Sequence, residues 1–188
     1  MVRRYEGDPR ALDWGSRDSQ SLRFSILAQV ARLEGASVLD IGCGVGDLLE
    51  YLRLKEVSVD YTGYDLTPEM IQSARRRFPG HRFETRDLLM EQEPTELFDY
   101  VLASGIFYLR QYEPMRYLES MARRMFVACR KGAAFNTLSV MASQRAPGEF
   151  YADPAHVLKM CLEITPSVAV RHDYLPHDFT VYLYKARR

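Results

Sequence analysis

The apolar positions of this chain alternate between short continuous runs and longer stretches with helical spacing. Continuous apolar runs bounded by glycine, proline or aspartate are typical of buried strands, and apolar positions three or four apart are typical of covering helices. The runs predict seven strands, at residues 38–41, 57–64, 81–85, 98–103, 133–140, 168–174 and 179–185. Because helical patterns separate most of these runs, the chain is predicted to fold as an α/β protein.

Capping residues and proline set the expected ends of the helices. A helix capped by Ser16 or Ser19 is predicted to run to about Leu33, ahead of the first strand. Three further helices are predicted. One begins at Thr67-Pro68, one begins at Pro114 and ends at Gly132, and one begins at Asp153-Pro154. The first helix lies outside the alternating pattern of strands and helices.

One stretch, Ser37 to Glu50, carries the strongest chemical signal and reads SVLDIGCGVGDLLE. A strand, a glycine turn and a helix follow one another there, and such a turn lets a ligand touch the backbone. A dinucleotide fingerprint would need a third glycine at position 47. That position is Asp47, whose carboxylate would repel a phosphate, so a nicotinamide-dependent oxidoreductase is the weakest alternative.

The pattern G-x-G-x-G preceded by Asp40 resembles the first motif of the class I S-adenosylmethionine-dependent methyltransferases. The resemblance implies a three-layer sandwich around a seven-stranded, mostly parallel sheet of order 3-2-1-4-5-7-6, with the last strand antiparallel. In that family the glycine loop passes the methionine part of the cofactor. An acidic residue after the second strand is placed to accept hydrogen bonds from ribose hydroxyls, and Asp65 matches it.

Later motifs follow in the order that the family requires. Asp87 and Leu88 match an acidic residue near the adenine amine and an apolar neighbour on the ring. The segment FDYVLASG, which ends at Gly105, resembles the fourth motif, beside the departing methyl group. The resemblance thus assigns ten residues to cofactor binding, namely Asp40, Gly42, Gly44, Gly46, Asp65, Leu66, Met70, Asp87, Leu88 and Ser104.

Both ends of the chain are expected to form the walls of the acceptor site. The leading helix would contribute Trp14, Gln20 and Arg23, although a packed amphipathic helix is an equal alternative. The loop 141–152 would contribute Tyr151. Tyr108 would orient a nucleophile or form a wall of the pocket.

The terminal hairpin is expected at the carboxyl edge of the sheet, where His172 or His177 would act as a general base beside a neighbouring aspartate. A surface hairpin with solvated charges is the alternative. The five-residue offset between the two His-Asp pairs fits no familiar ligand spacing, so no metal is expected.

Composition narrows the class of partner. The 188 residues carry 25 basic and 25 acidic side chains, so no global field recruits nucleic acid or an anionic membrane. Three cysteines without C-x-x-C pairing fit a reduced, cytoplasmic protein, and no run resembles a signal or a membrane span. We expect a monomer or homodimer with a single domain, divided into an arm and covering helix (1–35), a cofactor-binding core (36–140) and a substrate region (141–188).

The implied reaction is direct displacement, in which an oxygen, nitrogen or carbon nucleophile takes the methyl group and S-adenosylhomocysteine leaves. We expect a small-molecule acceptor because the charge is balanced and no recognition domain is appended. A methyltransferase acting on protein or RNA and a noncatalytic cofactor-binding module remain alternatives.

Overall fold

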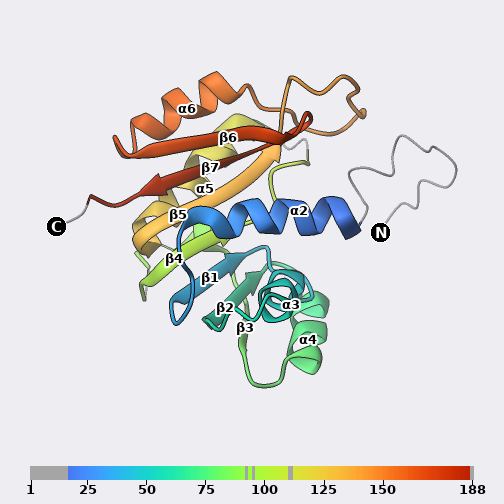
Figure 1. The fold of residues 1–188 in the computed structure, drawn as a ribbon, viewed down its shortest axis with the longest axis vertical. Coiled ribbons are helices and arrows are strands. Elements are labelled where there is room, and N and C mark those ends of the chain that lie inside the picture. The colour runs from blue at the N-terminus through green and yellow to red at the C-terminus, as the bar shows by residue number, and fades with distance from the viewer. Residues whose placement is uncertain (1–16, 92, 95, 110–111, 187–188) are drawn as a thin grey trace, which may run out of the picture.

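The computed structural model describes residues 17–91, 93–94, 96–109 and 112–186. Its sheet has the order β3-β2-β1-β4-β5-β7-β6, which confirms the expected topology (Figure 1). β7 runs antiparallel to β5 and β6, and the remaining neighbours are parallel. The strands are β1 Ser37–Ile41, β2 Asp60–Asp65, β3 Arg82–Thr85, β4 Phe98–Ala103, β5 Cys129–Leu138, β6 Val168–Leu175 and β7 Asp178–Tyr184.

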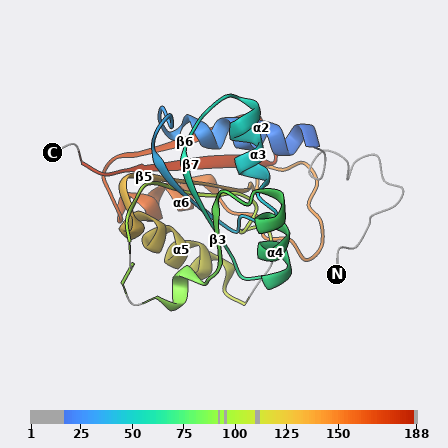
Figure 2. The ribbon, with the colours of Figure 1, turned by 90° about the horizontal axis from the view of Figure 1, so that it is seen from below.

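Helices cover both faces of the sheet, as the apolar periodicity predicts. One face packs against α2, α3 and α4, and the other packs against α5 and α6, with the short helix η2 beside them (Figure 2). The helices are α2 Arg17–Leu27, η1 Ala28–Val30, α3 Asp47–Leu54, α4 Pro68–Arg77, η2 Leu88–Met90, α5 Pro114–Ala128 and α6 Pro154–Leu162. The single helix predicted before the first strand is thus an α-helix followed by a 3-10 turn.

Two expected boundaries are wrong. β5 begins at Cys129, directly after α5, so Gly132 lies inside the strand and does not end the helix. A Cβ on Gly132 would lie 3.0 Å from the carbonyl oxygen of Leu183 on β7, so the close approach of that strand favours glycine there. β2 begins at Asp60 rather than at residue 57.

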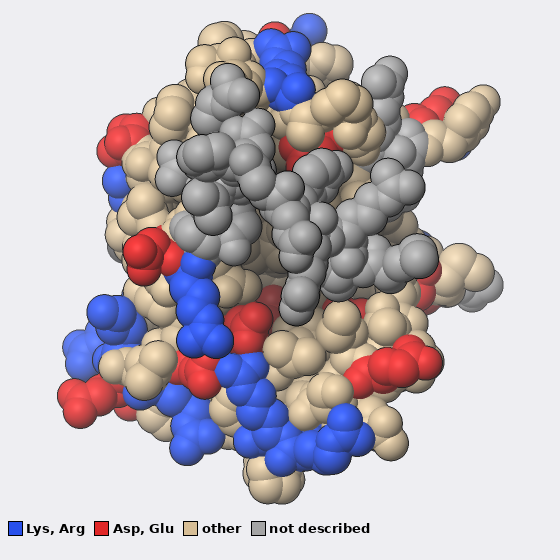
Figure 3. Space-filling model, turned by 90° about the vertical axis from the view of Figure 1, so that its right-hand side faces the viewer, with Lys and Arg blue, Asp and Glu red and all other residues tan. Residues whose placement is uncertain are grey.

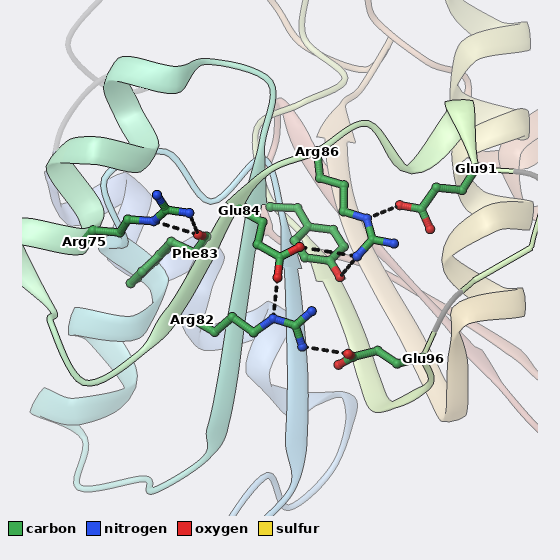
Figure 4. Close-up of polar contacts among 8 residues, drawn as sticks. Arg75, Arg82, Phe83, Glu84, Arg86, Glu91 and Glu96 are labelled. Carbon is green, nitrogen blue, oxygen red and sulfur yellow. Dashed lines mark hydrogen bonds and ion pairs between the residues drawn. The ribbon is translucent and has the colours of Figure 1, made fainter.

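Charged side chains protect the open edge of the sheet at β3. The Nε and Nη2 atoms of Arg75 donate to the carbonyl oxygen of Phe83, at 2.9 and 2.6 Å (Figure 4). Arg82 pairs with Glu84 at 2.5 Å and with Glu96 at 2.6 Å. An edge strand with a bonded carbonyl and charged side chains is a poor template for pairing with another chain.

The parallel strands all end at one side of the molecule, which Figure 3 faces. In an open α/β sheet this carboxyl edge is where ligands bind. The glycine turn after β1, Asp65 at the end of β2, and the segments after β4 and β5 all lie along it.

Candidate active site

The glycine turn between β1 and α3 has three glycines in the left-handed region, with φ of 72° at Gly42, 54° at Gly44 and 87° at Gly46. A Cβ on Gly42 would lie 2.2 Å from Cγ2 of Ile106, and one on Gly46 would lie 2.8 Å from the ring of Phe78. At Gly44 nothing lies within 4 Å of that position. The turn is therefore packed at both ends and open at its middle, where a ligand can approach the backbone.

Asp65 links this turn to the start of α4 by hydrogen bonds. Its Oδ2 atom accepts a hydrogen bond from the backbone N–H of Gly44 at 2.9 Å, and Oδ1 accepts from the N–H of Thr67 at 2.8 Å. An ionised carboxylate has about four lone-pair sites, so each oxygen keeps capacity to accept a further hydrogen bond. The carboxylate thus closes a turn onto Thr67, the N-cap residue of α4, whose own side chain makes no capping hydrogen bond, and it also lies at the open part of the glycine turn.

Asp40 lies in the interior, at the opposite side of the turn from the open space. It is 3% exposed, and the hydroxyl of Tyr61 donates to its Oδ2 atom at 2.6 Å. Burial raises the pKa of Asp40 to about 7, and the Tyr61 hydrogen bond opposes this shift. This hydrogen bond links Asp40 of β1 to Tyr61 of β2.

Apolar side chains stand exposed beside Asp65. Leu66 is 63% exposed and Met70 is 40% exposed. Leu88, in contrast, is 4% exposed and belongs to the core cluster. Asp87 accepts a hydrogen bond from the N–H of Leu89 at 2.9 Å, so its Oδ1 atom caps η2.

Arg86 holds the segment that carries Asp87. Its Nε atom donates to Glu91 at 2.5 Å, across η2. Its Nη1 atom donates to the Tyr64 hydroxyl at 2.8 Å, and the guanidinium lies 4.9 Å from the centre of that ring (Figure 4). The residues that follow β3 are thereby fixed against β2.

The segment after β4 is fixed by a side chain of β5. The Oδ1 atom of Asn136 accepts from the backbone N–H of Gly105 at 3.1 Å, and its Nδ2 atom donates to the Ser104 hydroxyl at 3.0 Å. Gly105 has φ of 76° and open space where a Cβ would lie. A second glycine that faces open space thus lies next to the glycine turn.

The first turns of α2 lie over this edge. The Nε2 atom of Gln20 lies 3.4 Å from Oδ2 of Asp47 at the start of α3. Arg23 is buried and donates to the Ser19 hydroxyl at 2.8 Å. Burial lowers the pKa of Arg23, and the charge of Asp178 opposes that shift. Trp14 lies outside the described residues.

The two halves of the expected His-Asp pair are not brought together. The ring of His172 packs edge-on against Phe179, with 5.9 Å between centroids. Phe179 belongs to the core cluster under α5 and α6. Asp173 instead pairs with Arg171 at 3.0 Å. A base formed by His172 and Asp173 has no support in this arrangement.

A different group of polar residues from the hairpin lies on the α2 side of the sheet. The Tyr174 hydroxyl donates to Asp178 and lies 2.8 Å from the Thr180 hydroxyl. Asp178 is 2% exposed, and burial raises its pKa to about 7. The carbonyl oxygen of His177, in the turn, accepts from the N–H of Ser139 at 2.9 Å. The hairpin thereby contributes a buried carboxyl group and two hydroxyls.

The loop 141–152 is tied to the segment after β4. The N–H of Phe150 donates to the carbonyl oxygen of Tyr108 at 2.8 Å. The Tyr151 hydroxyl donates to Glu149 at 2.6 Å and accepts from the N–H of Ala146 at 2.9 Å. Tyr151 therefore stabilises the loop itself.

Sequence reasoning did not find Asn136 and Thr180 at this edge, nor the hydrogen bonds that join Tyr174 to Asp178 and Thr180. Asn136 had a visible signal, because it is an amide near the end of an apolar strand, AAFNTL. The others depend on the pairing of β6 with β7, which a single sequence does not set. Within the described residues, no group of three or more His, Cys, Asp or Glu side chains is placed to hold a metal ion.

Comparison with known proteins agrees with this geometry. Residues 38–126 match a family model described as a methyltransferase domain. A Mycobacterium tuberculosis protein named "Putative methyltransferase Rv1506c" is 36% identical over 157 residues, which cover 80% of this chain and 93% of that protein. A trans-aconitate 2-methyltransferase of Variovorax paradoxus is 32% identical over 132 residues. The match covers 70% of this chain but only 45% of that enzyme.

Solved structures share the fold at low identity. The magnesium protoporphyrin IX methyltransferase of Synechocystis PCC 6803, crystallised with bound S-adenosylmethionine, superposes with a TM-score of 0.70 at 15% identity. The superposition covers 96% of this chain and 86% of that one. A methyltransferase of Archaeoglobus fulgidus gives a TM-score of 0.70 at 16% identity, over 95% of this chain and all of that one.

Proposed function

Because this chain belongs to the class I S-adenosylmethionine-dependent methyltransferases, we propose that it methylates a small-molecule acceptor held at the carboxyl edge of its sheet. The observation that carries the proposal is the position of Asp65. Its carboxylate adjoins the one glycine of the turn, Gly44, that faces open space. A hydrogen-bond acceptor beside an open backbone fits a ligand with vicinal hydroxyls.

The residues around the turn fit each part of the cofactor. Asp65 would accept from ribose hydroxyls, and the exposed side chains of Leu66 and Met70 would cover the adenosine. Asp87 keeps lone pairs for an amine after capping η2. Gly42 and Gly46 act through packing.

The bound cofactor supplies an activated methyl group to a nucleophile. The remaining contribution of the protein is to position the acceptor and exclude water, which lowers the barrier by several kcal/mol. The segment Ser104 to Tyr108, the loop 141–152 and α2 border the space beyond Gly105 and would provide these walls. A base is needed only where the nucleophile arrives protonated.

A small acceptor is supported by the surface as well as by the relatives. Where the carboxyl edge is described, acidic and basic side chains are intermingled (Figure 3). Arg77, for example, pairs with Asp47 and Glu50. A single-sign patch of the kind that recruits nucleic acid does not form there. The relatives named for trans-aconitate also act on a small molecule.

No helix among the described residues is long and apolar enough to span a bilayer. The thiols of Cys43, Cys129 and Cys161 are free and buried. Free thiols are typical of a reducing compartment, which supports a cytoplasmic location. A monomer or homodimer remains our expectation for the assembly.

Transfer of radiolabelled methyl from S-adenosylmethionine into a lysate tests the proposal, if metabolites, RNA and protein are separated beforehand. We expect label in the metabolite fraction with the wild-type chain and none with Asp65→Ala. Asp60→Ala is the matched control, because Asp60 is an exposed aspartate at the opposite end of β2, and it should retain full transfer. Label confined to RNA or protein would contradict the small-molecule acceptor.

A further inference from the structure

Asn136 is a buried carboxamide in an otherwise apolar part of β5. It is 1% exposed, and its neighbours Ala133, Ala134 and Phe135 are all fully buried. Burying an amide costs free energy unless its donors and acceptors are bonded. The hydrogen bonds that compensate this cost therefore indicate what the residue does.

The partners of this amide lie just beyond the end of the backbone ladder. β4 and β5 pair in register up to Ala103 and Phe135, and the ladder ends there. The next residue of β5, Asn136, bonds by its side chain to the next two residues after β4, Ser104 and Gly105. The side chain thus continues the pairing of two strands after their backbones separate.

The segment held in this way lies directly against the glycine turn. Ile106 follows Gly105, and its Cγ2 atom lies 2.2 Å from the place that a Cβ of Gly42 would occupy. Gly105 itself faces open space. One side of the segment is therefore in contact with the cofactor turn, and another borders the space proposed for the acceptor.

We infer that Asn136 is a positioning residue for methyl transfer, which fixes the segment Ser104 to Ile106 between the cofactor turn and the acceptor. This inference rests on the proposed function. Methyl transfer by displacement requires the nucleophile, the methyl carbon and the leaving sulfur to lie in line. Small displacements of a bordering segment are costly, since a misplacement of about 1 Å can slow a reaction roughly 100-fold.

The adjacent residue supplies a matched control. Thr137 is 3% exposed, and its hydroxyl has no hydrogen-bond partner in the described part of the chain. It is the next residue along β5, so its side chain points to the other face of the sheet. Thr137→Val removes a polar atom from the same strand without removing a hydrogen bond to the segment after β4.

The test compares Asn136→Ala, Ser104→Ala, the double variant and Thr137→Val with the wild-type chain. The rate of S-adenosylhomocysteine formation is measured with saturating S-adenosylmethionine, and the metabolite fraction supplies the acceptor. The assay temperature lies well below the thermal unfolding midpoint of each protein. Binding of S-adenosylhomocysteine is measured separately by calorimetry. We expect Asn136→Ala to lower the rate about tenfold or more, while the dissociation constant changes less than about threefold.

The other variants separate positioning from simple loss of structure. Thr137→Val should retain the wild-type rate. Ser104→Ala should lose less than Asn136→Ala, because the bond to the Gly105 N–H remains. The double variant should be no slower than Asn136→Ala alone, since both changes remove the same contact.

A wild-type rate in Asn136→Ala would overturn the inference and leave the proposed function standing. A rate loss matched by an equal loss of S-adenosylhomocysteine binding would also overturn it, because the residue would then serve the cofactor. Absence of transfer to any fraction by the wild-type chain would instead refute the proposed function, and the inference with it.

Discussion

The two ends of the carboxyl edge are built in different ways. On the cofactor side, the ends of β1, β2 and β3, the contacts are made by backbone groups and short acidic side chains close to each strand end, as between Asp65 and Gly44. On the acceptor side, the carboxyl ends of β4, β5 and β6 and the start of β7, side chains bond to other side chains, as Asn136 does to Ser104 and Tyr174 does to Asp178. We therefore expect substitutions on the cofactor side to change cofactor binding, and those on the acceptor side to change the transfer rate.

The largest expected effect lies on the cofactor side, at Gly42. Gly42→Ala places a Cβ 2.2 Å from Ile106 and also imposes a left-handed conformation on alanine. We expect the free energy of unfolding to fall by about 4 kcal/mol. Gly35→Ala is the control, because Gly35 has φ of 70° and open space around it, and it should cost only about 1 kcal/mol. Equal losses measured by urea denaturation would show that packing against Ile106 is not important.

A second expected effect, a dependence of stability on pH, concerns both sides because each side buries one carboxyl group. The two groups are Asp40 and Asp178, and the pKa of each is about 7. Because the folded-state pKa lies above the ordinary value of 3.8, the folded chain binds more protons than the unfolded chain between about pH 4 and pH 7. Stability should therefore fall as the pH rises through this window. In Asp40→Asn, the decrease in unfolding free energy over this window should be smaller by about 2–3 kcal/mol.

Urea denaturation at pH 4.5 and at pH 7.5, roughly the ends of that window, measures this dependence. Asp178→Asn should flatten the same profile independently. If neither variant changes the difference in unfolding free energy between the two pH values, the buried carboxyl groups do not titrate as described.

Gly44→Ala should weaken cofactor binding without the packing clash expected for Gly42→Ala. Nothing surrounds its Cβ position, so the loss of stability should match that of Gly35→Ala. The new methyl group would occupy the space proposed for the cofactor. Calorimetry should show roughly tenfold weaker binding of S-adenosylmethionine, about 1.4 kcal/mol. Unchanged affinity would mean that the cofactor does not pass Gly44.

The smallest expected effect lies on the acceptor side. Tyr174→Phe removes the hydroxyl that bonds Asp178 and Thr180. It should cost about 1 kcal/mol in unfolding free energy and slow methyl transfer without changing cofactor affinity. A loss of S-adenosylmethionine binding in this variant would show that the two sides are not separate.

The sequence was sufficient where local rules decide the structure. β4 and the starts of α4, α5 and α6 followed from apolar runs and from proline and aspartate caps, whereas the order of the sheet followed from the family resemblance. The end of α5 did not, because Gly132 is a typical helix terminator and only the approach of β7 explains its place in β5. Local propensity cannot reveal a neighbour that is distant in sequence.

The same difference explains which site residues were found. Gly42 and Gly44 lie within one motif, and Asp65 ends a strand that pairs with its neighbour. His172 and Asp173 are adjacent in sequence, but the pairing of β6 with β7 is irregular between Arg171 and Leu175, which the sequence pattern does not predict. In this segment His172 packs against Phe179 and Asp173 pairs with Arg171, whereas Tyr174 reaches Asp178 across the hairpin.

The central claim is that Asp65 holds the cofactor at the open middle of the glycine turn, and calorimetric titration of S-adenosylmethionine into the wild-type chain and Asp65→Asn tests it most directly. The change keeps the shape of the side chain and removes its charge. We expect measurable binding to the wild-type chain and at least roughly 30-fold weaker binding to the variant, about 2 kcal/mol. Equal affinity of the two proteins would contradict it.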